Sequence, residues 1–527
     1  MQKIYLFFAS LVIGTVASYA QTPAMIKDIY PGLTNSNPEN LTQVNGIMFF
    51  SATDNVNGTE LWKSDGTAAG TQLVKDITSG SANSSPRDFI NVNGTLYFIA
   101  SAGSLYKSDG TTAGTIGVSG LSYPASFTNV NGTLFFTQEN PTYGRELWKS
   151  DGTAVGTVLV KDINPGTSSF PGNLTTVNGT LFFTANDGNG IALWKSDGTT
   201  TGTVLLKTLN VAVLETRAMG GIFFFVVSQS GVGRELWKSD GTIAGTVIVK
   251  DINPGSSDAY PEGLMEANGA LFFQANDGTN GKELWKSDGT AGGTVMVKDI
   301  RTGASSSSPS YLTNVNGTLF FVANDGALGK ELWKTDGTTG GTVLVKDIVS
   351  GTGTPFSTTS LPFPSFLSIQ DTLYFTANDG VNGLELWKSD GTNAGTVLLK
   401  DIYPGSSGSG IPAFATASNR LFFNANDGSN GAELWSLNSD ITTGVENSPE
   451  SVNAKIYPNP CSGVLNIELA IGEILSIKVN DLLGKQVFGA ETLYDNKINL
   501  NMLNSGIYFI EVQTNYWTIT QKIVIQN

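Results

Sequence analysis

"ELWKSDGTAAGTQLVKDI", residues 60–77, is repeated along the chain with changes at only a few positions. Close copies of the phrase begin at Glu146, Glu235, Glu283, Glu331 and Glu385. Its Trp recurs every 42 to 54 residues, and Tyr106 takes that place in the second copy. These positions define nine copies of one repeat of about 46 residues. Such a period predicts a repeat architecture in which each copy is one supersecondary structure.

Each full repeat has the pattern of four short strands. In the seventh copy, residues 312–316 and 330–336 alternate apolar and polar, whereas 318–324 and 342–348 are rich in aromatic or β-branched residues. Asn-Gly, DGALG and DGTTGG sequences separate these stretches, and Gly and Asn accept the positive φ of tight hairpins. A four-stranded meander at this period predicts the blades of an all-β propeller. A β-solenoid is the alternative, but its coils are usually shorter and lack three hairpins per repeat.

The two ends of the repeat array complement each other. The ninth copy stops after "ELWSLNSD", residues 433–440, and lacks a fourth strand. "MIKDIYPG", residues 25–32, has the pattern of a fourth strand with no copy before it. Joined, these segments complete one blade and protect two sheet edges. The sequence therefore predicts a β-propeller of about nine four-stranded blades closed by the N-terminal strand.

The two faces of such a ring differ in sequence. The Asn-Gly and SDGT turns fall on one face and are nearly the same in every copy, whereas the loops between repeats fall on the other face and vary. The longest of these loops is residues 349–365. Because variable loops on a rigid scaffold usually carry binding, we expect ligand contacts there. The candidate residues are the loop aromatics Tyr123, Phe170, Tyr260, Tyr311, Phe356 and Phe363. The alternative is that several of these rings only cap the core.

Charge and composition exclude several classes of function. The formal net charge is −15, which opposes binding to nucleic acid or to anionic membranes. The chain has no His, so Ser-His-Asp catalysis and His-ligated zinc or haem sites are excluded. Cys461 stands alone and cannot form an intramolecular disulfide. The partners that we expect therefore include no nucleic acid.

The N-terminus has the pattern of a secretory signal peptide. Lys3 is followed by an apolar run over residues 4–16, and small residues precede a predicted cleavage site between Ala20 and Gln21. The run is short for a membrane span, and no later stretch has the length or composition of one. We therefore expect an exported protein without a transmembrane segment.

Two acidic motifs are candidates for chemistry. The Asp of SDGT recurs eight times, and since a catalytic group is needed once, we interpret it as a turn-fixing acceptor and predict no catalytic residue. Asp277 and Glu283 lie six residues apart across a Gly-rich turn, where hard oxygen ligands could hold Ca²⁺. Hairpin geometry alone accounts for those glycines. No cofactor or metal site is predicted, with Ca²⁺ as the alternative.

The repeats, over about residues 25–437, resemble the ELWxxDGT repeat family. "ELWKSDGT" or "ELWKTDGT" is intact in six copies, and "SLYKSDGT", "ALWKSDGT" and "ELWSLNSD" depart from it. The resemblance implies an exported, propeller-like protein of unassigned activity. It supplies no catalytic residues.

A second resemblance covers the C-terminal end. After a polar linker, "KIYPNPCSGVLNIEL" (455–469), "SIKVNDLLGKQVF" (476–488), "LNSGIYFIEV" (503–512) and "QKIVIQ" (521–526) resemble the type A sorting domain of type IX secretion. Alternating strands and Gly turns predict a small, sandwich-like all-β domain. The resemblance implies the type IX secretion machinery as a partner and a secreted or cell-surface location. Its opening motif is carried by Tyr457, Pro458, Asn459 and Pro460.

The sequence thus predicts a signal peptide (1–20), a repeat propeller (21–438), a linker (439–454) and a sorting domain (455–527). The predicted function is non-catalytic binding or adhesion, with an extracellular glycan or protein as the ligand of the variable loops. A carboxylate-based glycan hydrolase and a passive structural surface protein remain the alternatives.

Overall fold

The computed structural model describes most of the chain. The described residues are 22–118, 123–356, 365–438, 454–457, 461–469, 474–481, 485–490, 497–514 and 518–526. They contain strands and no helix. The chain divides into two compact parts, one ending at Asp440 and one beginning at Ile441, and each is described here by itself.

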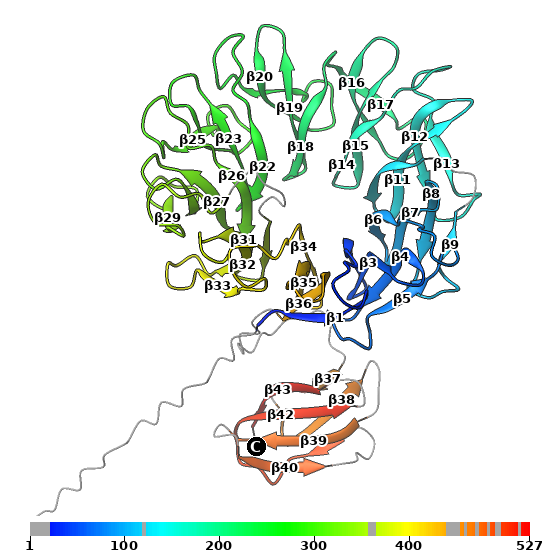
Figure 1. Ribbon diagram of the computed structural model, residues 1–527, viewed down its shortest axis with the longest axis vertical. Helices are drawn as coiled ribbons and strands as arrows, with labels where there is room; N and C mark the ends of the chain where they lie inside the picture. Colours follow the sequence, from blue (N-terminus) through cyan, green and yellow to red (C-terminus); the bar gives the residue numbers. More distant parts are fainter. Residues whose placement is uncertain are drawn as a thin grey trace, which may run out of the picture. The chain divides into compact units, whose positions relative to one another are not determined.

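In the N-terminal part, the described residues form nine four-stranded antiparallel sheets around a common centre (Figure 1). Sheets 1 to 8 each take four consecutive strands, from β2–β5 to β30–β33, and sheet 9 has the order β34–β35–β36–β1. Each sheet corresponds to one sequence repeat. This architecture is consistent with propeller-like blades, as the repeat pattern predicts.

The strands of each sheet are named by their order in the repeat. The first strands are β2 (Glu39–Val44), β6 (Arg87–Val92), β10 (Ala125–Val130), β14 (Gly172–Val177), β18 (Val213–Met219), β22 (Glu262–Ala267), β26 (Ser310–Val315), β30 (Phe366–Ile369) and β34 (Phe414–Ala417). The second strands are β3 (Ile47–Asp54), β7 (Thr95–Ala100), β11 (Thr133–Asn140), β15 (Thr180–Asn186), β19 (Ile222–Gln229), β23 (Ala270–Asn276), β27 (Thr318–Asn324), β31 (Thr372–Asn378) and β35 (Arg420–Asn426).

The third strands carry the ELWK sequence and the fourth strands precede the loops between repeats. The third strands are β4 (Gly58–Ser64), β8 (Ser104–Ser108), β12 (Gly144–Ser150), β16 (Ile191–Ser196), β20 (Gly233–Ser239), β24 (Lys282–Ser287), β28 (Lys330–Thr335), β32 (Leu384–Ser389) and β36 (Ala432–Asn438). The fourth strands are β5 (Gln72–Lys75), β9 (Ile116–Gly117), β13 (Val158–Lys161), β17 (Val204–Thr208), β21 (Val247–Lys250), β25 (Val295–Lys298), β29 (Val343–Lys346), β33 (Val397–Lys400) and β1 (Ala24–Lys27).

The core lies between neighbouring sheets. The second strands read as apolar runs, such as "TLFFVAN" in β27, because both of their faces are buried. One cluster joins Phe135 and Leu147 of sheet 3 to Phe183 and Trp194 of sheet 4. The Trp of the repeated phrase therefore packs between sheets, as its position on the strand predicts.

Antiparallel pairing assigns the connections to two faces. The Asn-Gly and SDGT turns lie on one face, which we call the turn face. The hairpins between second and third strands and the loops between repeats lie on the other, which we call the loop face. On the turn face, neighbouring sheets are tied by side chains. Asn45 Nδ2 donates to Gly94 O at 3.0 Å, and Ser418 Oγ of sheet 9 donates to Gly46 O of sheet 1 at 3.0 Å.

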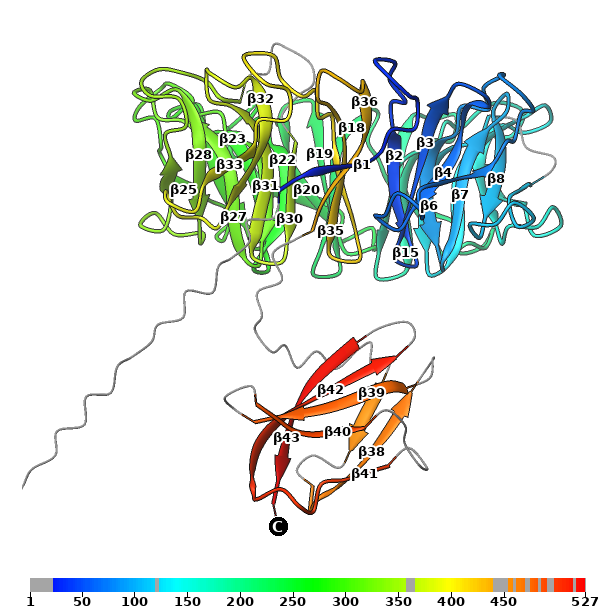
Figure 2. The ribbon, with the colours of Figure 1, turned by 60° about the horizontal axis from the view of Figure 1, so that its bottom comes forward.

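Sheet 9 is built from both ends of the repeat array. β1 pairs antiparallel with β36, and Met25 lies opposite Trp435 (Figure 2). The Glu433 carboxylate accepts hydrogen bonds from the Ile29 amide at 2.9 Å and from the Ser36 hydroxyl at 2.6 Å. β1 thus takes the position of the fourth strand that the ninth repeat lacks.

The C-terminal part is all-β and contains two sheets in its described residues. One has the order β37 (Ala454–Tyr457), β38 (Val464–Leu469) and β41 (Lys497–Asn499). The other has the order β40 (Gln486–Ala490), β39 (Ile474–Asn480), β42 (Gly506–Thr514) and β43 (Thr518–Ile525). Leu465 and Ile467 of the first sheet share a buried cluster with Val479 and Ile510 of the second, and Cys461 is a buried free thiol.

Deletion of residues 22–30 removes β1 and the Ile29 amide that binds Glu433. We expect the free energy of unfolding to fall by about 3 kcal/mol or more, because several backbone bonds are lost and a buried carboxylate loses a donor. Denaturant unfolding of the otherwise intact chain measures the change. Ser36→Ala removes one bond to the same carboxylate and should cost about 1 kcal/mol. A deletion variant as stable as the unmodified chain would contradict the pairing of β1 with β36.

Candidate functional site

The SDGT sequence forms a self-contained turn. Asp65 Oδ1 accepts hydrogen bonds from the Thr67 amide at 2.8 Å and from its hydroxyl at 2.7 Å, while the Ser64 and Thr71 hydroxyls bond each other at 2.8 Å. The same Asp contacts recur in all eight copies of SDGT or TDGT. In the second copy, hydrogen bonds from Thr111 hold the pKa of Asp109 below its ordinary value. These carboxylates fix turns, which supports the structural interpretation of the motif.

In most repeats, the Lys at the end of the fourth strand joins its sheet to the next one. Lys250 Nζ donates to Thr294 O of the following sheet at 2.8 Å and lies 5.7 Å from the centre of the Trp285 ring. Equivalent contacts connect Lys27 to Thr71 and Trp62. The cation–π geometry and the charged hydrogen bond both stabilise the interface between sheets. The Lys and Trp side chains of the repeated phrase therefore have a structural role, which is to hold neighbouring sheets together.

The Glu of ELW joins the third strand to the loop that leads into the next sheet. Glu283 is fully buried, and its carboxylate accepts hydrogen bonds from the Ile300 amide at 3.0 Å and the Ser307 amide at 2.9 Å. The Ser307 hydroxyl also donates to it. Burial raises the pKa of Glu283, while these three donors oppose the rise. The Glu283 carboxylate therefore has a structural role and is bonded to its own loop.

Glu331 differs from Glu283 in having fewer donors. The Asn324 amide donates to Ser307 O in sheet 7, and in sheet 8 the Asn378 amide donates to Pro355 O. Pro355 therefore stands where the other loop has Ser, and it has neither a hydroxyl nor an N–H to donate. Among the described atoms, Glu331 Oε1 is buried without a hydrogen-bond partner. Burial, together with the charge of Asp347, raises the pKa of Glu331 to about 8.

Two predicted ligand contacts are exposed on the loop face. Tyr123 and Phe170 are 63% and 67% exposed. Their φ angles are +51° and +48°, and each directly precedes a Pro. A bulky residue at positive φ is a rare and strained conformation. At the equivalent position, sheets 1, 2 and 7 have small polar residues, namely Asn37, Ser85 and Ser308.

A third predicted contact, Tyr260, is enclosed by charged side chains. Its φ is +52°, and its ring centre lies 4.8 Å from the Arg234 guanidinium and 4.9 Å from Lys282 Nζ. Both cations pair with Glu262, at 3.5 and 3.4 Å. The ring is therefore occupied by intramolecular cation–π contacts, which offset the strained backbone.

The structure places the remaining aromatics away from a common surface. The Tyr311 ring stacks on Phe366 with 5.2 Å between ring centres. Phe356 is fully buried and packs against Phe366 and Phe375, which corrects its prediction as a ligand contact. Phe363 lies outside the described residues.

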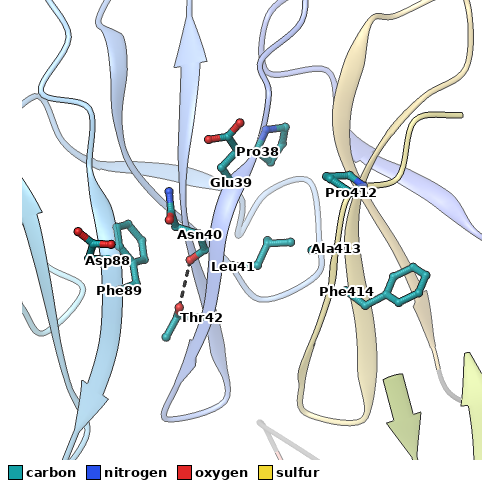
Figure 3. A pocket seen from close by; sticks show the side chains of 10 residues that line it. All are labelled: Pro38, Glu39, Asn40, Leu41, Thr42, Asp88, Phe89, Pro412, Ala413 and Phe414. Carbon is teal, nitrogen blue, oxygen red and sulfur yellow. Dashed lines mark hydrogen bonds between the residues drawn. The ribbon is translucent and has the colours of Figure 1, made fainter. Parts of the chain in front are cut away.

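A cavity of about 530 Å³ opens where the loops of three sheets enter their first strands (Figure 3). It is lined by Pro38, Glu39, Asn40, Leu41, Thr42, Asp88, Phe89, Pro412, Ala413 and Phe414. These residues begin β2, β6 and β34, so the cavity belongs to sheets 1, 2 and 9 and lies toward the loop face. Largely apolar walls with a few polar groups are typical of ligand pockets.

Sequence reasoning missed this cavity. Its walls come from residues 38–42 and 88–89 together with residues 412–414, which lie more than 320 positions further along the chain, and only the proximity of sheet 9 to sheet 1 brings them together. The sequence contained one indication of a variable surface here, which is that the residue after the loop Pro differs between repeats. It is Glu39 in sheet 1, Arg87 in sheet 2, Ala125 in sheet 3 and Gly172 in sheet 4.

The structure also bears on the calcium alternative. The Asp277 carboxylate accepts hydrogen bonds from the Thr279 and Asn280 amides at 2.9 and 2.8 Å and from Asn280 Nδ2 at 2.8 Å. Glu283 binds its own loop. Across the described part of the chain, no group of three or more His, Cys, Asp or Glu side chains is placed to hold a metal ion.

Residues 455–526 match the family model of the secretion system C-terminal sorting domain. This match confirms the expected location: the chain is an exported protein of the cell surface or the medium, and its sorting tail implies contact with the type IX secretion machinery. No helix within the described ranges is long and apolar enough to cross a membrane. Of the sorting motif, Tyr457 is exposed at the end of β37. Pro458, Asn459 and Pro460, like Ala20 and Gln21, lie outside the described residues.

Solved structures give only distant likenesses. A computationally designed protein, Ika8, has 14% identity and a TM-score of 0.37, with 79% of this chain and 99% of that chain covered. A puromycin hydrolase mutant complexed with PGG has 12% identity and a TM-score of 0.37, covering 77% of this chain and 60% of that one. A prolyl endopeptidase has 14% identity and a TM-score of 0.35, covering 68% and 55%. The chain thus spans little more than half of these two peptidases. No curated protein matches it.

Glu331→Gln tests the unpartnered carboxylate. Because the folded-state pKa is about 8 and the ordinary value is 4.5, the carboxyl favours the fold only while protonated. Its contribution is complete below about pH 4.5 and is lost as the pH rises toward 8. When the pH rises from about 5 to about 8.5, the unfolding free energy of E331Q should increase by about 1–3 kcal/mol relative to that of the unmodified chain. Denaturant unfolding at both pH values measures this gain.

Two variants serve as controls for that prediction. Pro355→Ser restores a hydroxyl donor beside Glu331 and should reduce the pH dependence. Glu283→Gln removes a carboxylate that has three donors, so it should not show the same gain at high pH. Equal pH profiles for E331Q and E283Q would contradict the role of the missing Ser.

Proposed function

We propose that this chain is a cell-surface or released recognition protein that binds an extracellular glycan or protein on its loop face without catalysis. Its scaffold is a closed, nine-bladed propeller over residues 21–438, made of ELWxxDGT-like repeats. Two observations support closure: the first strands contact one another in sequence, and β34 contacts β2. The Arg420 guanidinium also donates to Gly66 O at 2.8 Å, across the same junction.

The contrast between the two faces carries the proposal. On the turn face, the Ser, Asp and Thr side chains form the same hydrogen bonds with one another and with the turn backbone in each copy of SDGT or TDGT. On the loop face lie a cavity of about 530 Å³ with walls specific to sheets 1, 2 and 9, and two exposed aromatic rings on strained backbone. A surface that differs from copy to copy on an otherwise repeated scaffold is suited to recognition or adhesion.

A panel of polysaccharides and surface proteins tests binding by the full secreted chain. We expect at least one ligand to be retained, and Ala413→Trp, which fills the cavity, to weaken ligands that enter it. Ala68→Trp, on an exposed SDGT turn, is the matched control and should leave binding unchanged. Absence of binding across the panel would contradict a recognition role and favour a passive structural protein.

A carboxylate-based glycan hydrolase is the second candidate, favoured by one observation. Glu39 and Asp88 line the same cavity, and a pair of carboxylates flanking the scissile bond is the usual arrangement in glycosidases. Release of reducing ends from the bound polysaccharides, lost in both Glu39→Gln and Asp88→Asn, would support hydrolysis. Retained binding without release supports the proposed non-catalytic role.

Removal of residues 455–527 tests the role of the sorting domain. Because this segment matches a secretion sorting domain and forms its own buried core, the repeat region should still fold while losing its export address. We expect the truncated protein to accumulate inside the outer membrane, as measured by cell fractionation. Its appearance in the medium at the normal level would contradict dependence on this domain.

A further inference from the structure

We propose that Tyr123 and Phe170 form a stacking platform for the pyranose rings of an extracellular polysaccharide, on the loop face of sheets 3 and 4. This inference rests on the proposed recognition function and names its ligand class and its site. The two residues occupy the same position in consecutive repeats, directly before the Pro that leads into β10 and β14.

The backbone conformation at Tyr123 and Phe170 indicates that their aromatic rings do not stabilise the fold. The loop residue at this position donates its amide to the start of a third strand, as Phe170 N does to Arg145 O at 3.2 Å and Ser85 N does to Thr59 O at 3.1 Å. All of these residues have positive φ, which Asn accepts at little cost and bulky residues do not. An aromatic ring here strains the backbone, and at 63% and 67% exposure it gains little from burial.

Tyr260 shows what a structural aromatic at this position looks like. Its ring contacts both Arg234 and Lys282, and those contacts offset the strain. No ring or cation–π contact of this kind joins Tyr123 or Phe170 to other described residues. No aromatic or cation–π contact therefore offsets the strained backbone at these two positions, which points to an external ligand for the rings.

The second repeat leaves room for a ligand beside Tyr123. Phe98 and Tyr106 are eight residues apart in sheet 2, whereas Phe50 and Trp62 are twelve apart in sheet 1, so the hairpin of sheet 2 is shorter on the loop face. The Tyr123 amide donates to Gly103 O in that hairpin at 3.2 Å. The Tyr123 ring rests on Gly103, where an added Cβ would lie 2.8 Å from its Cδ1. One part of the ring is supported by backbone and the rest is open to solvent.

Polar groups that sugar hydroxyls need lie between the two rings. The Arg145 side chain is held by Glu139 at 3.4 Å and donates to Thr137 Oγ1 at 3.2 Å and to Tyr123 O at 3.5 Å. The Arg145 carbonyl accepts the amide of Phe170. Arg145 and Glu139 thus present a fixed donor and acceptor pair beside Tyr123, and sugars combine apolar ring faces with hydroxyl edges.

The arrangement fits a polysaccharide better than a protein. A stable protein interface buries about 800 Å² per partner around a contiguous apolar centre. Here the two exposed rings are separated by the charged pair Arg145–Glu139 and recur with the spacing of the repeats. A polymer of repeating rings matches two equivalent platforms in series, each of which adds to the affinity.

The double variant Tyr123→Asn, Phe170→Asn tests the platform in the full secreted chain. Insoluble cellulose, chitin, xylan and an α-glucan serve as probes, and depletion of protein from solution measures binding. We expect the unmodified chain to bind at least one of them and the double variant to lose at least tenfold in affinity. Because Asn accepts positive φ, the melting temperature of the double variant should be equal to or higher than that of the unmodified chain.

Tyr260→Asn is the matched control, made at the same position of another repeat. It should keep polysaccharide binding and lower the melting temperature, since it removes two cation–π contacts. Undiminished binding by the Y123N, F170N variant, or loss of binding only in A413W, would overturn the platform while leaving the recognition function intact. If the unmodified chain binds surface proteins but none of the polysaccharides, the proposed platform is also overturned. Binding to neither class would overturn the recognition function as well.

Discussion

In seven of the nine repeats, a buried glutamate joins the sheet to the loop that leads into the next one, whereas Ser104 and Ala192 stand at this position in sheets 2 and 4. In Glu60, Glu146, Glu283 and Glu433 the carboxylate binds two loop amides and a Ser hydroxyl at once. A fully buried carboxylate is costly unless it is satisfied, so the loop is fixed wherever its donors are present. Because the loop is fixed, the following first strand starts at a defined place, and the side chains around the ring centre are positioned by the repeat.

This constraint separates what is repeated from what can vary. The Trp, Lys and Glu side chains of the phrase make contacts between a sheet and its neighbour or the loop that leads to it. The polar groups of SDGT form hydrogen bonds within their own turn. The loops between repeats differ in sequence from copy to copy, and some of their side chains face solvent. Tyr123 and Phe170 occupy such positions, and so does Glu39 at the rim of the cavity. Recognition chemistry can therefore differ between copies without altering the fold.

Much of this could be predicted from the sequence, because period and turn chemistry are local. The aromatic-rich stretch 318–324 is β27 with the same bounds, and the fourth strand that the ninth repeat lacks is β1. The fate of individual aromatics could not be predicted. Phe356 and Phe170 stand in similar loop sequences, yet Phe356 is buried, whereas Phe170, which has a positive φ, is exposed. The cavity was hidden because it forms only where residues 38–42 meet 412–414.

The pairing of β1 with β36 also sets the order in which the protein can fold. Most strand pairs form within one repeat, so sheets 1 to 8 can assemble as short-range events. The contact between Ile29 and Glu433 spans 404 residues and must wait for the last repeat. Until then, two strand edges with unpaired backbone groups remain open to other chains. The joining of β1 to β36 is therefore a late step in folding, and it is the step that removes these two open edges.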